Sequence, residues 1–397
     1  MDSTNSPSGF RPATVRKTIG LALQGGGSWG AYTWGVLDAL LASRSIAIAQ
    51  LSGTSAGAIN AAIVTGALAK GSPASARQAL RAFWLSIANH ATVDLICGLW
   101  GPFKRHWRNS MNEWLLACGT LPHLRANPFA VDLLRGAIAE HVDIDAIRSK
   151  FAPALFVTVT NVKTGLPRVI SNDAMSIDAL LASACLPDLF PAVEIDGESY
   201  WDGGYGGNPT LWPMIHSGLA CDLIIVQLMR DRMDEVPTGT LAVQRRVSEI
   251  VFNSSLVAEM QAISAMRAVA ESGSAPARVA DVRLHRIGPP PIELFERGNG
   301  IDRARAWLEL LRDEGLAAGK QFVARHGADI GARETLDVAG VFVDANKPRF
   351  PVPACDVSAL RNVSALRSGA SASSSDISGD STAPTPSRPT TLGSDSV

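Results

Sequence analysis

The amino-acid sequence predicts an α/β fold, because short buried strands alternate with helical segments along most of the chain. Near the N-terminus this happens twice in succession. An apolar run at 21–23 leads through a glycine-rich loop into a helical pattern at 31–41, and a second run at 46–51 leads through a tight turn into 56–69. Strand, turn and helix in this order form the repeating unit of α/β proteins. Hydrophobic residues make up 46% of the 397 residues, which is enough for a sizeable core.

The spacing of apolar residues predicts the remaining elements. β-branched residues favour a strand at 155–160 that pairs with 168–170 through a short turn, and Asp196-Gly197 favours a hairpin between 193–195 and 198–201. Further strands are expected at 221–228 and 282–287, and further helices at 74–90, 127–150, 177–184, 241–271 and 301–324.

Composition divides the chain into four segments. The N-terminal lead is rich in Ser, Pro, Asn and Thr, and the C-terminal tail is rich in Ser, Thr and Pro. Neither has the apolar residues needed to form a core, so we expect both to be disordered. The segments are 1–17 for the lead, 18–330 for one folded domain (18–228 with the motifs described below, 229–330 as its helical completion), 331–364 for a C-terminal extension and 365–397 for the tail.

Charge and cysteine content exclude several classes of function. The formal net charge of −1 gives no general attraction to nucleic acid or to an anionic membrane, and we expect no nucleic-acid partner. The five cysteines are scattered, odd in number and form no C-x-x-C pair. This pattern argues against a disulfide framework and against a structural zinc site, and it indicates a reducing compartment.

Neither a secretory signal nor a membrane-spanning helix is expected. Residues 1–17 contain no apolar run of the kind that a signal peptide needs. Residues 45–69 carry no charge and are long enough to cross a bilayer, but polar residues cluster in their middle, which favours a buried strand, turn and helix. We therefore expect a cytoplasmic protein whose contact with membranes is peripheral.

Residues 53–57 read Gly-Thr-Ser-Ala-Gly and fit the pattern G-x-S-x-G. In this pattern a serine lies on a sharp turn between a strand and a helix, so that its hydroxyl is presented to a substrate. Glycines on both sides allow the tight backbone path, which a Cβ atom would obstruct. The alternative is that Ser55 only caps the helix that follows. The choice depends on whether the chain supplies partners for this hydroxyl.

The loop at 24–30 reads Gln-Gly-Gly-Gly-Ser-Trp-Gly and lies between a predicted strand and a predicted helix. Such a loop exposes backbone N–H groups that can bind negative charge. Its glycines fit the G-x-G-x-x-G spacing of dinucleotide sites, but no acidic residue between Asp38 and Asp94 is available to hold a ribose. An oxyanion hole, which stabilises the negative oxygen formed when a nucleophile attacks an ester, is therefore favoured. We expect no cofactor.

Asp202 is followed by four glycines within five residues, at 203, 204, 206 and 207. This density of glycine indicates a loop whose backbone closely approaches another part of the molecule. The simpler alternative is an acidic turn, since Asp-Gly is common in turns. None of the seven histidines lies in a glycine-rich motif. A triad of serine, aspartate and histidine with His216 or His285 as its third member remains open at this point.

Residues 94–124 combine large apolar side chains with cations. They are interpreted either as core or as a cap and acyl-binding wall, in which tryptophans contact lipid and cations contact phosphate at a membrane surface. The residues concerned are Leu95, Ile96, Leu99, Trp100, Phe103, Trp107, Met111, Trp114, Leu115 and Leu116, with Lys104, Arg105 and Arg108 among them.

With these motifs in place, the chain resembles the patatin-like phospholipase family, including its bacterial members. Three motifs carry the resemblance, at 25–30, 53–57 and 202–204, in the order that the family shows. Weaker support comes from Ala-Ser-Ala-Cys-Leu-Pro at 182–187 and from the aromatic residues just before Asp202. The likeness covers roughly residues 18–228. Two positions depart from the family pattern: Gly204 stands where many members have alanine, and the bulky Trp29 lies beside the expected oxyanion hole, where it would shape the acyl site.

The resemblance implies a three-layer α/β/α fold around a central, mostly parallel sheet, and a catalytic dyad that cleaves the acyl esters of lipids. It assigns Ser55 as the nucleophile and Asp202 as the base, and it implies no metal. The backbone N–H groups of Gly25, Gly26, Gly27, Ser28, Trp29 and Gly30 would form the oxyanion hole, and Gly53, Gly57, Gly203 and Gly204 would support the motifs.

The expected function is therefore that of a carboxylic ester hydrolase of the phospholipase A or lysophospholipase type. It would act through an acyl-enzyme in lipid degradation or membrane lipid turnover, with a lipid or acyl ester as its partner. Two alternatives remain: an α/β-hydrolase esterase with a Ser-Asp-His triad, and a non-catalytic protein that binds lipid on the same fold.

Overall fold

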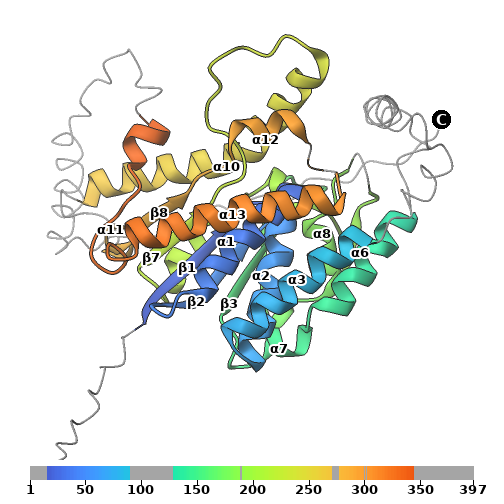
Figure 1. Ribbon diagram of the computed structural model, residues 1–397, viewed down its shortest axis with the longest axis horizontal. Helices are drawn as coiled ribbons and strands as arrows, with labels where there is room; N and C mark the ends of the chain where they lie inside the picture. Colours follow the sequence, from blue (N-terminus) through green and yellow to red (C-terminus); the bar gives the residue numbers. More distant parts are fainter. Residues whose placement is uncertain are drawn as a thin grey trace, which may run out of the picture. The chain divides into compact units, whose positions relative to one another are not determined.

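A computed structural model describes residues 16–89, 128–187, 190–270, 277–298, 300 and 302–343 (Figure 1). The expected membrane-contact segment at 94–124 lies outside the described residues, as do nearly all of the expected N-terminal lead, most of the extension at 331–364 and the whole tail at 365–397. The described part belongs to one compact unit that ends at Asn346. Within it, no helix is long and apolar enough to cross a membrane.

The core is a mixed sheet. Its parallel strands are β1 (Lys17–Leu23), β2 (Ile46–Gly53), β3 (Ala154–Asn161), β7 (Asp222–Val226) and β8 (Arg283–Ile287). Antiparallel strands complete one side: β4 (Pro167–Ser171) and β6 (Glu198–Asp202) pair with β3, and β5 (Val193–Ile195) pairs with β6. Across the described residues the strand order is β5-β6-β3-β2-β1-β7-β8, with β4 pairing to β3 outside this path.

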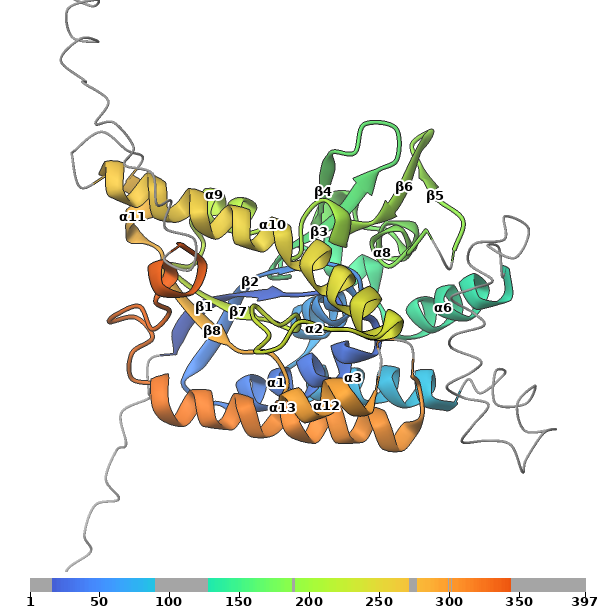
Figure 2. The same ribbon diagram turned by 90° about the horizontal axis from the view of Figure 1, so that it is seen from above.

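Helices cover both faces of the sheet (Figure 2). One face carries α1 (Gly30–Ala42), α2 (Ala56–Lys70), α3 (Pro73–Asn89) and α13 (Arg305–His326), and the other carries α9 (Trp212–Ser217), α10 (Thr240–Ala270) and α11 (Ala277–Asp281). Alternate residues of β7 enter the two cores: Ile224 packs with the α1 side and Ile225 with the α10 side. The layers confirm the expected three-layer α/β/α fold with a mostly parallel sheet. The other helices are α6 (Pro128–His141), α7 (Ile144–Arg148), α8 (Ile177–Ser183) and α12 (Ile292–Arg297).

The structure differs from the predicted elements in three places. The single helix expected at 127–150 is two helices, because the Asp143 carboxylate accepts a hydrogen bond from the Ala146 amide (2.8 Å) and starts α7 there. The short helices α9, α11 and α12 were not predicted. Packing also continues past residue 330: Leu336 and Phe342 are buried in the core on the α10 side.

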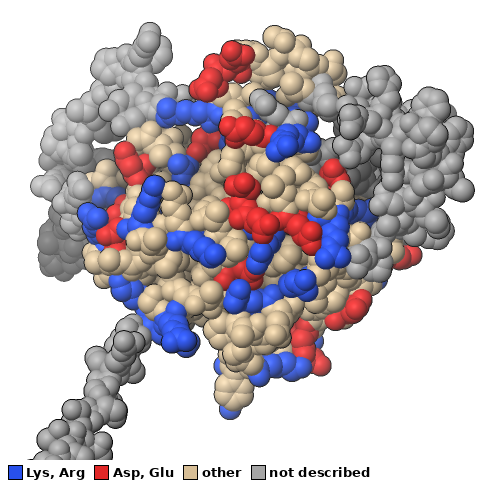
Figure 3. Space-filling view, viewed as in Figure 1, with Lys and Arg blue, Asp and Glu red and all other residues tan. Residues whose placement is uncertain are grey.

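The surface over α13 mixes the two signs of charge. Figure 3 shows Lys and Arg interspersed with Asp and Glu across this face. Arg312 of α13 pairs with the buried Asp38 of α1 at 2.6 Å, and Arg305 pairs with Glu309 one turn along α13 at 2.9 Å. Such mixing matches the near-zero net charge of the chain. It provides no single-sign field on this face that would attract a polyanion.

Candidate active site

Ser55 lies on the sharp turn that connects β2 to α2. Its backbone has φ 54° and ψ −126°, a conformation that non-glycine residues rarely adopt and that costs energy. The neighbouring glycines make the turn possible. A Cβ atom on Gly53 would lie 2.5 Å from the Gly57 carbonyl oxygen, and one on Gly57 would lie 2.2 Å from the carbonyl oxygen of Leu23 in β1. The two glycines singled out in the sequence are therefore required by backbone contact.

A buried serine from another helix holds this strained turn. The Ser55 amide donates a hydrogen bond to Ser183 Oγ at 2.9 Å, and the Ser183 hydroxyl donates to the Thr158 carbonyl at 2.7 Å. Ser183 ends α8 and is fully buried. Sequence reasoning did not assign Ser183 to the site, although the segment that contains it, at 182–187, supported the family resemblance. Ser183 thus connects the turn to strand β3.

Strand β3 also determines where Asp202 lies relative to Ser55. β4 pairs with β3 along 156–160, which overlaps both the β2 pairing at 154–157 and the β6 pairing at 159–161. A strand has two edges, so β2 and β6 share the edge opposite β4. β2 ends with Gly53 beside Val157, and β6 ends with Asp202 beside Val159. The two strands run toward each other along one edge, and their ends meet where Ser55 begins the turn.

Asp202 is buried completely, and none of the described Lys, Arg or His residues forms an ion pair with it. Its Oδ1 accepts a hydrogen bond from the Gly204 amide at 2.7 Å, while Oδ2 has no partner of regular geometry among the described residues. Burial raises the pKa of Asp202 to about 7, although the Gly204 amide and the nearby Ser55 hydroxyl both lower it. The structure therefore brings Ser55 and Asp202 together, and Asp202 Oδ2 is the oxygen available to accept a hydrogen bond from the Ser55 hydroxyl.

The glycines after Asp202 allow close packing of three segments. A Cβ atom on Gly203 would lie 2.0 Å from the Thr158 carbonyl oxygen and 3.0 Å from the Thr54 side chain. One on Gly204 would lie 2.3 Å from the Phe252 ring of α10. The loop therefore fits between β3, the serine turn and α10. The close approach expected from its glycine content is what the structure shows.

The glycine-rich loop lies directly against the serine turn. A Cβ atom on Gly25 would lie 2.7 Å from Ser55 Cβ and 2.6 Å from the Thr54 carbonyl oxygen. The loop begins at the C-terminal end of β1, next to the end of β2 in the sheet. All three sequence motifs therefore meet at one end of the parallel strands, where ligands bind in α/β proteins.

Four of the six expected oxyanion donors already have partners. The Gly25 amide donates to Asn208 Oδ1 (2.6 Å), and the Ser28 amide donates to the Gly300 carbonyl (2.8 Å). The Trp29 amide donates to the Gly26 carbonyl (3.3 Å), and the Gly30 amide donates to the carbonyls at 27 and 28. In the described part of the chain, the amides of Gly26 and Gly27 have no such acceptor.

Trp29 does not line an open space beside Ser55. Its side chain is 6% exposed, stacks on Phe295 of α12 with ring centres 4.4 Å apart, and meets Trp307 of α13 edge-on at 5.5 Å. The ring therefore anchors the glycine-rich loop to these two helices. The sequence predicted that Trp29 shapes the acyl site, whereas the structure places its ring in the core.

The histidines considered for a triad lie away from Ser55. His285 is buried in β8, where its Nε2 and Nδ1 bond to Asp222 Oδ1 (3.0 Å) and Thr335 Oγ1 (2.8 Å). It is level with Leu51 and three strands away from β2. His216 is exposed at the end of α9. The hydroxyl of its neighbour Ser217 donates to Gln50 Oε1, in the middle of β2 and several residues before Ser55. His90, His106 and His123 lie outside the described residues.

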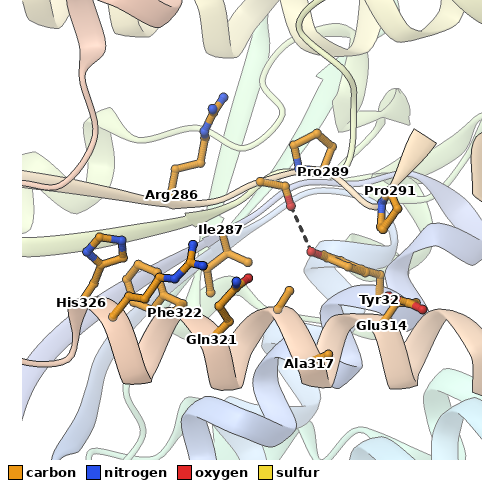
Figure 4. Close-up of a pocket in the computed structure, with 13 residues that line it drawn as sticks. Tyr32, Arg286, Ile287, Pro289, Pro291, Glu314, Ala317, Gln321, Phe322 and His326 are labelled. Atoms are coloured by element: carbon orange, nitrogen blue, oxygen red, sulfur yellow. Dashed lines mark hydrogen bonds between the residues drawn. The ribbon is translucent and has the colours of Figure 1, made fainter. Parts of the chain in front are cut away.

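A cavity of about 610 Å³ lies beside α13 and is separate from the Ser55 site (Figure 4). Its lining includes Tyr32, Arg286 and Phe322 but neither Ser55 nor Asp202. The Tyr32 hydroxyl donates to the Gly288 carbonyl at 3.1 Å across one end of it. The described residues also contain no cluster of His, Cys, Asp or Glu able to hold a metal ion. The cavity therefore contributes no residue to the Ser55 site.

Comparison with known proteins agrees with the three motifs. The sequence profile of the patatin-like phospholipase family matches residues 21–215. VipD from Legionella pneumophila is 16% identical, with 79% of this chain and 68% of VipD covered and a TM-score of 0.40. A chain of the ExoU–SpcU complex from the type III secretion system of Pseudomonas aeruginosa is 15% identical, with 89% of this chain and 61% of that chain covered and a TM-score of 0.33. No protein with a curated description matches significantly.

Proposed function

Because the chain belongs to the patatin-like phospholipase family through residues 21–215, we propose that it is a serine lipid acyl hydrolase with Ser55 as nucleophile and Asp202 as base. One observation carries the assignment. A fully buried carboxylate, one oxygen of which has no regular hydrogen bond within the described residues, lies next to a serine on a strained strand-to-helix turn. Strain and incomplete hydrogen bonding persist in folded proteins mainly at functional sites.

The environment of Asp202 suits it to act as a base. An ordinary aspartate has a pKa near 3.9 and accepts protons weakly at neutral pH. Burial raises the pKa of Asp202 to about 7, which lies near the operating pH and makes proton transfer from serine more favourable. No histidine among the described residues bonds to either Ser55 or Asp202. A two-residue mechanism is therefore the simplest that this part of the chain supports.

The reaction would run through two tetrahedral intermediates. As Ser55 Oγ attacks the ester carbonyl carbon, its proton moves to Asp202 and the carbonyl oxygen becomes an oxyanion. Collapse of this intermediate breaks the bond to the alcohol, which leaves with the proton from Asp202, and an acyl-Ser55 ester remains. Asp202 then takes a proton from water, the resulting hydroxide attacks the acyl ester, and Ser55 recovers its proton as the carboxylic acid departs.

The amides of Gly26 and Gly27 are the proposed donors to the oxyanion. The resemblance suggested six amides, but those of Gly25, Ser28, Trp29 and Gly30 are engaged within the protein. Donors that are already oriented stabilise an oxyanion without reorganising during the reaction, and loss of one costs on the order of 10²–10³ in rate. The engaged amides would instead fix the shape of the loop that carries the other two, which have no acceptor among the described residues.

The proposed substrate is an acyl ester of a lipid, and the proposed setting is lipid degradation or membrane lipid turnover in the cytoplasm. The family supports the lipid, and the Ser55 site supports cleavage of an ester. Membrane contact through 94–124 remains a prediction from the sequence.

The proposed function is tested by covalent labelling with a fluorophosphonate, which reacts with activated serines. The wild-type protein should take one label, and mass spectrometry should place it on Ser55. Ser55→Ala should abolish labelling and Asp202→Asn should slow it at least 100-fold, in the range of a lost general base. Ser254→Ala, on the exposed surface of α10, is the matched control and should label like the wild type.

Two results would contradict this function. Equal labelling of Ser55→Ala would place the reactive group elsewhere. A wild-type protein that binds lipid vesicles but takes no label and releases no fatty acid would be a non-catalytic lipid-binding protein.

A further inference from the structure

Asn208 ends the glycine-rich stretch that begins at Asp202, and its buried amide contacts the other glycine-rich loop. Its Oδ1 accepts the Gly25 amide at 2.6 Å, and its Nδ2 donates to the Phe252 carbonyl of α10 at 2.9 Å and lies 3.5 Å from the Gly25 carbonyl oxygen. The side chain is completely buried. One amide therefore contacts both polar groups of Gly25.

We propose that Asn208 is a positioning residue that fixes the Gly25 peptide, and with it the backbone that leads to the amides of Gly26 and Gly27, the proposed oxyanion donors. This inference rests on the proposed function, because it concerns the same oxyanion hole. By accepting the Gly25 amide, Asn208 prevents that amide from donating to an oxyanion and fixes its direction. Asn208 itself contacts neither Ser55 nor a reacting atom.

Small displacements of Gly25 would reach the nucleophile directly. There is no room between them, since even a methyl group on Gly25 would lie 2.7 Å from Ser55 Cβ. An error of about 1 Å in the position of a catalytic group can cost about 100-fold in rate. A side chain that holds Gly25 from both its N–H and its C=O side is therefore well placed to influence kcat.

A second buried amide holds the start of the same loop. Gln24 Oε1 accepts the amides of Leu228 and Met229, each at 2.7 Å, and Gln24 Nε2 donates to the Asn208 carbonyl (3.2 Å) and to Asn253 Oδ1 (3.0 Å). All four bonds of this amide are made within the protein. Gln24 thus ties the backbone of Asn208 to the end of β7 and to α10, and leaves the Asn208 side chain to orient Gly25.

The chemistry of position 208 requires an amide. It must accept from the Gly25 N–H and donate to the Phe252 carbonyl at the same time. An aspartate has the same shape and can accept, but an ionised carboxylate cannot donate and would face the Phe252 carbonyl oxygen. Alanine makes neither bond and leaves the Gly25 amide without its acceptor. The two substitutions therefore disturb the loop in different ways.

The test compares Asn208→Ala and Asn208→Asp with Asn172→Ala. Asn172 makes a similar set of bonds at the start of β3, far from Ser55: it accepts the Leu155 amide (2.7 Å) and donates to the carbonyls of Ile147 (2.8 Å) and Pro153 (3.0 Å). For each variant, kcat and KM are measured on p-nitrophenyl butyrate. The Ki is measured for an alkyl trifluoromethyl ketone, whose hemiketal with Ser55 carries an oxyanion.

Asn208→Ala should lower kcat roughly 10- to 100-fold with KM within about threefold, and it should weaken the Ki by a similar factor. Asn208→Asp keeps the shape of the side chain and should likewise lower kcat and weaken the Ki while KM changes little. Asn172→Ala should lose a comparable amount of thermal stability but keep kcat and Ki within about threefold of the wild type.

The proposal is overturned if kcat and Ki of the Asn208 variants follow those of Asn172→Ala at equal loss of Tm. If Asn208→Ala does not fold, the folded Asn208→Asp variant decides by the same criterion. Failure of the proposed function looks different, since the wild type would then take no fluorophosphonate label at Ser55.

Discussion

Two buried aspartates lie near opposite ends of the sheet, and they differ in what surrounds them. Asp222 begins β7, and its oxygens accept from the Arg283 guanidinium (2.8 and 3.0 Å), the Gly331 amide (2.9 Å) and His285 Nε2 (3.0 Å). Asp202 ends β6 and, within the part of the chain that the structure describes, accepts one regular hydrogen bond, from the Gly204 amide. Both are almost inaccessible, at 3% and 0% exposure, so burial alone does not separate them.

The surrounding donors move the two pKa values in opposite directions. Burial pushes the pKa of Asp222 upward, but the Arg283 guanidinium, the Gly331 amide and His285 outweigh it and hold that pKa below the usual value. At Asp202 burial dominates and the pKa rises to about 7. A carboxylate saturated with donors is a structural anchor, whereas an undersatisfied one keeps the capacity to accept a proton.

The largest expected effect separates the two aspartates by activity. Asp202→Asn should lower kcat/KM for a soluble ester by roughly 10²–10⁴, the range of a general base. Asp222→Asn should change it less than about threefold at a temperature where the protein stays folded. Steady-state kinetics of both variants checks this, and a large loss of kcat/KM in folded Asp222→Asn would remove the distinction.

The pH dependence of activity should follow Asp202. A protonated Asp202 cannot accept the Ser55 proton, so kcat/KM should rise with pH to a plateau, with a midpoint near 7 and about tenfold lower activity per unit below it. Glu259 is the control, because burial also raises its pKa to about 7 while it accepts the amides of Leu211 and Trp212. Glu259→Gln should keep the midpoint of the profile, and a shift would assign the titration to Glu259.

The stability of the two ends should respond oppositely to pH. The pKa of Asp202 is raised on folding, so its contribution is fully present below its unfolded pKa and is lost as pH rises through about 7. Asp202→Asn should therefore be more stable than the wild type at pH 8, by on the order of 4 kcal/mol, and the difference should be smaller at pH 5. Denaturant unfolding at both pH values measures this difference.

Asp222 has the opposite sign, since its pKa is lowered on folding. Its contribution is present above the unfolded pKa and is lost as the pH falls through the folded value. Asp222→Asn should accordingly destabilise the protein at pH 8 and less at pH 3. If both variants lose stability at pH 8, the contrast between the two carboxylates does not hold.

The smallest expected effect concerns single hydroxyls at the two ends. Ser183→Ala removes the acceptor of the Ser55 amide and should lower kcat about tenfold, since a strained turn is released. Thr335→Val removes the bond to His285 Nδ1 and should leave kcat within about twofold. The kcat of each variant is measured at the same number of degrees below that variant's Tm. Equal kcat values would show that Ser183 only supports packing.

Local patterns in the sequence predicted most of the fold and pointed to the residues proposed for the centre of the site. Ser55 and Asp202 were singled out because the glycines around them mark backbone that has no room for a Cβ atom, and such glycines are visible without a structure. The helix expected at 127–150 was wrong in its middle, because the capping residue Asp143 was read as part of a helical pattern. The short α9 and α12 have too few residues to show a period.

The supporting residues could not be predicted from spacing. Ser183 and Asn208 reach the site through the pairing of β3 with its neighbours and through the packing of α8 and α10. Nothing in their own sequence neighbourhoods specifies those contacts. Asn208 did follow a run of glycines, so its position was visible but its partner, Gly25, was not. Likewise, the loop pattern could not tell which of its amides were already engaged.

The edge of β3 that β2 and β6 share fixes how far apart Ser55 and Asp202 lie. The separation of Ser55 and Asp202, the proposed nucleophile and base, is set by backbone hydrogen bonds to neighbouring residues of one strand. A slip of β6 by one residue would move Asp202 by about 3.3 Å and turn its side chain to the other face of the sheet. By contrast, the turn at Lys163–Gly165 and the Asp196-Gly197 hairpin lie outside this ladder. Residues inserted in these turns, or a break of the chain made there, should leave the spacing of Ser55 and Asp202 intact. These turns are therefore suitable places to insert another domain or to split the chain into two fragments.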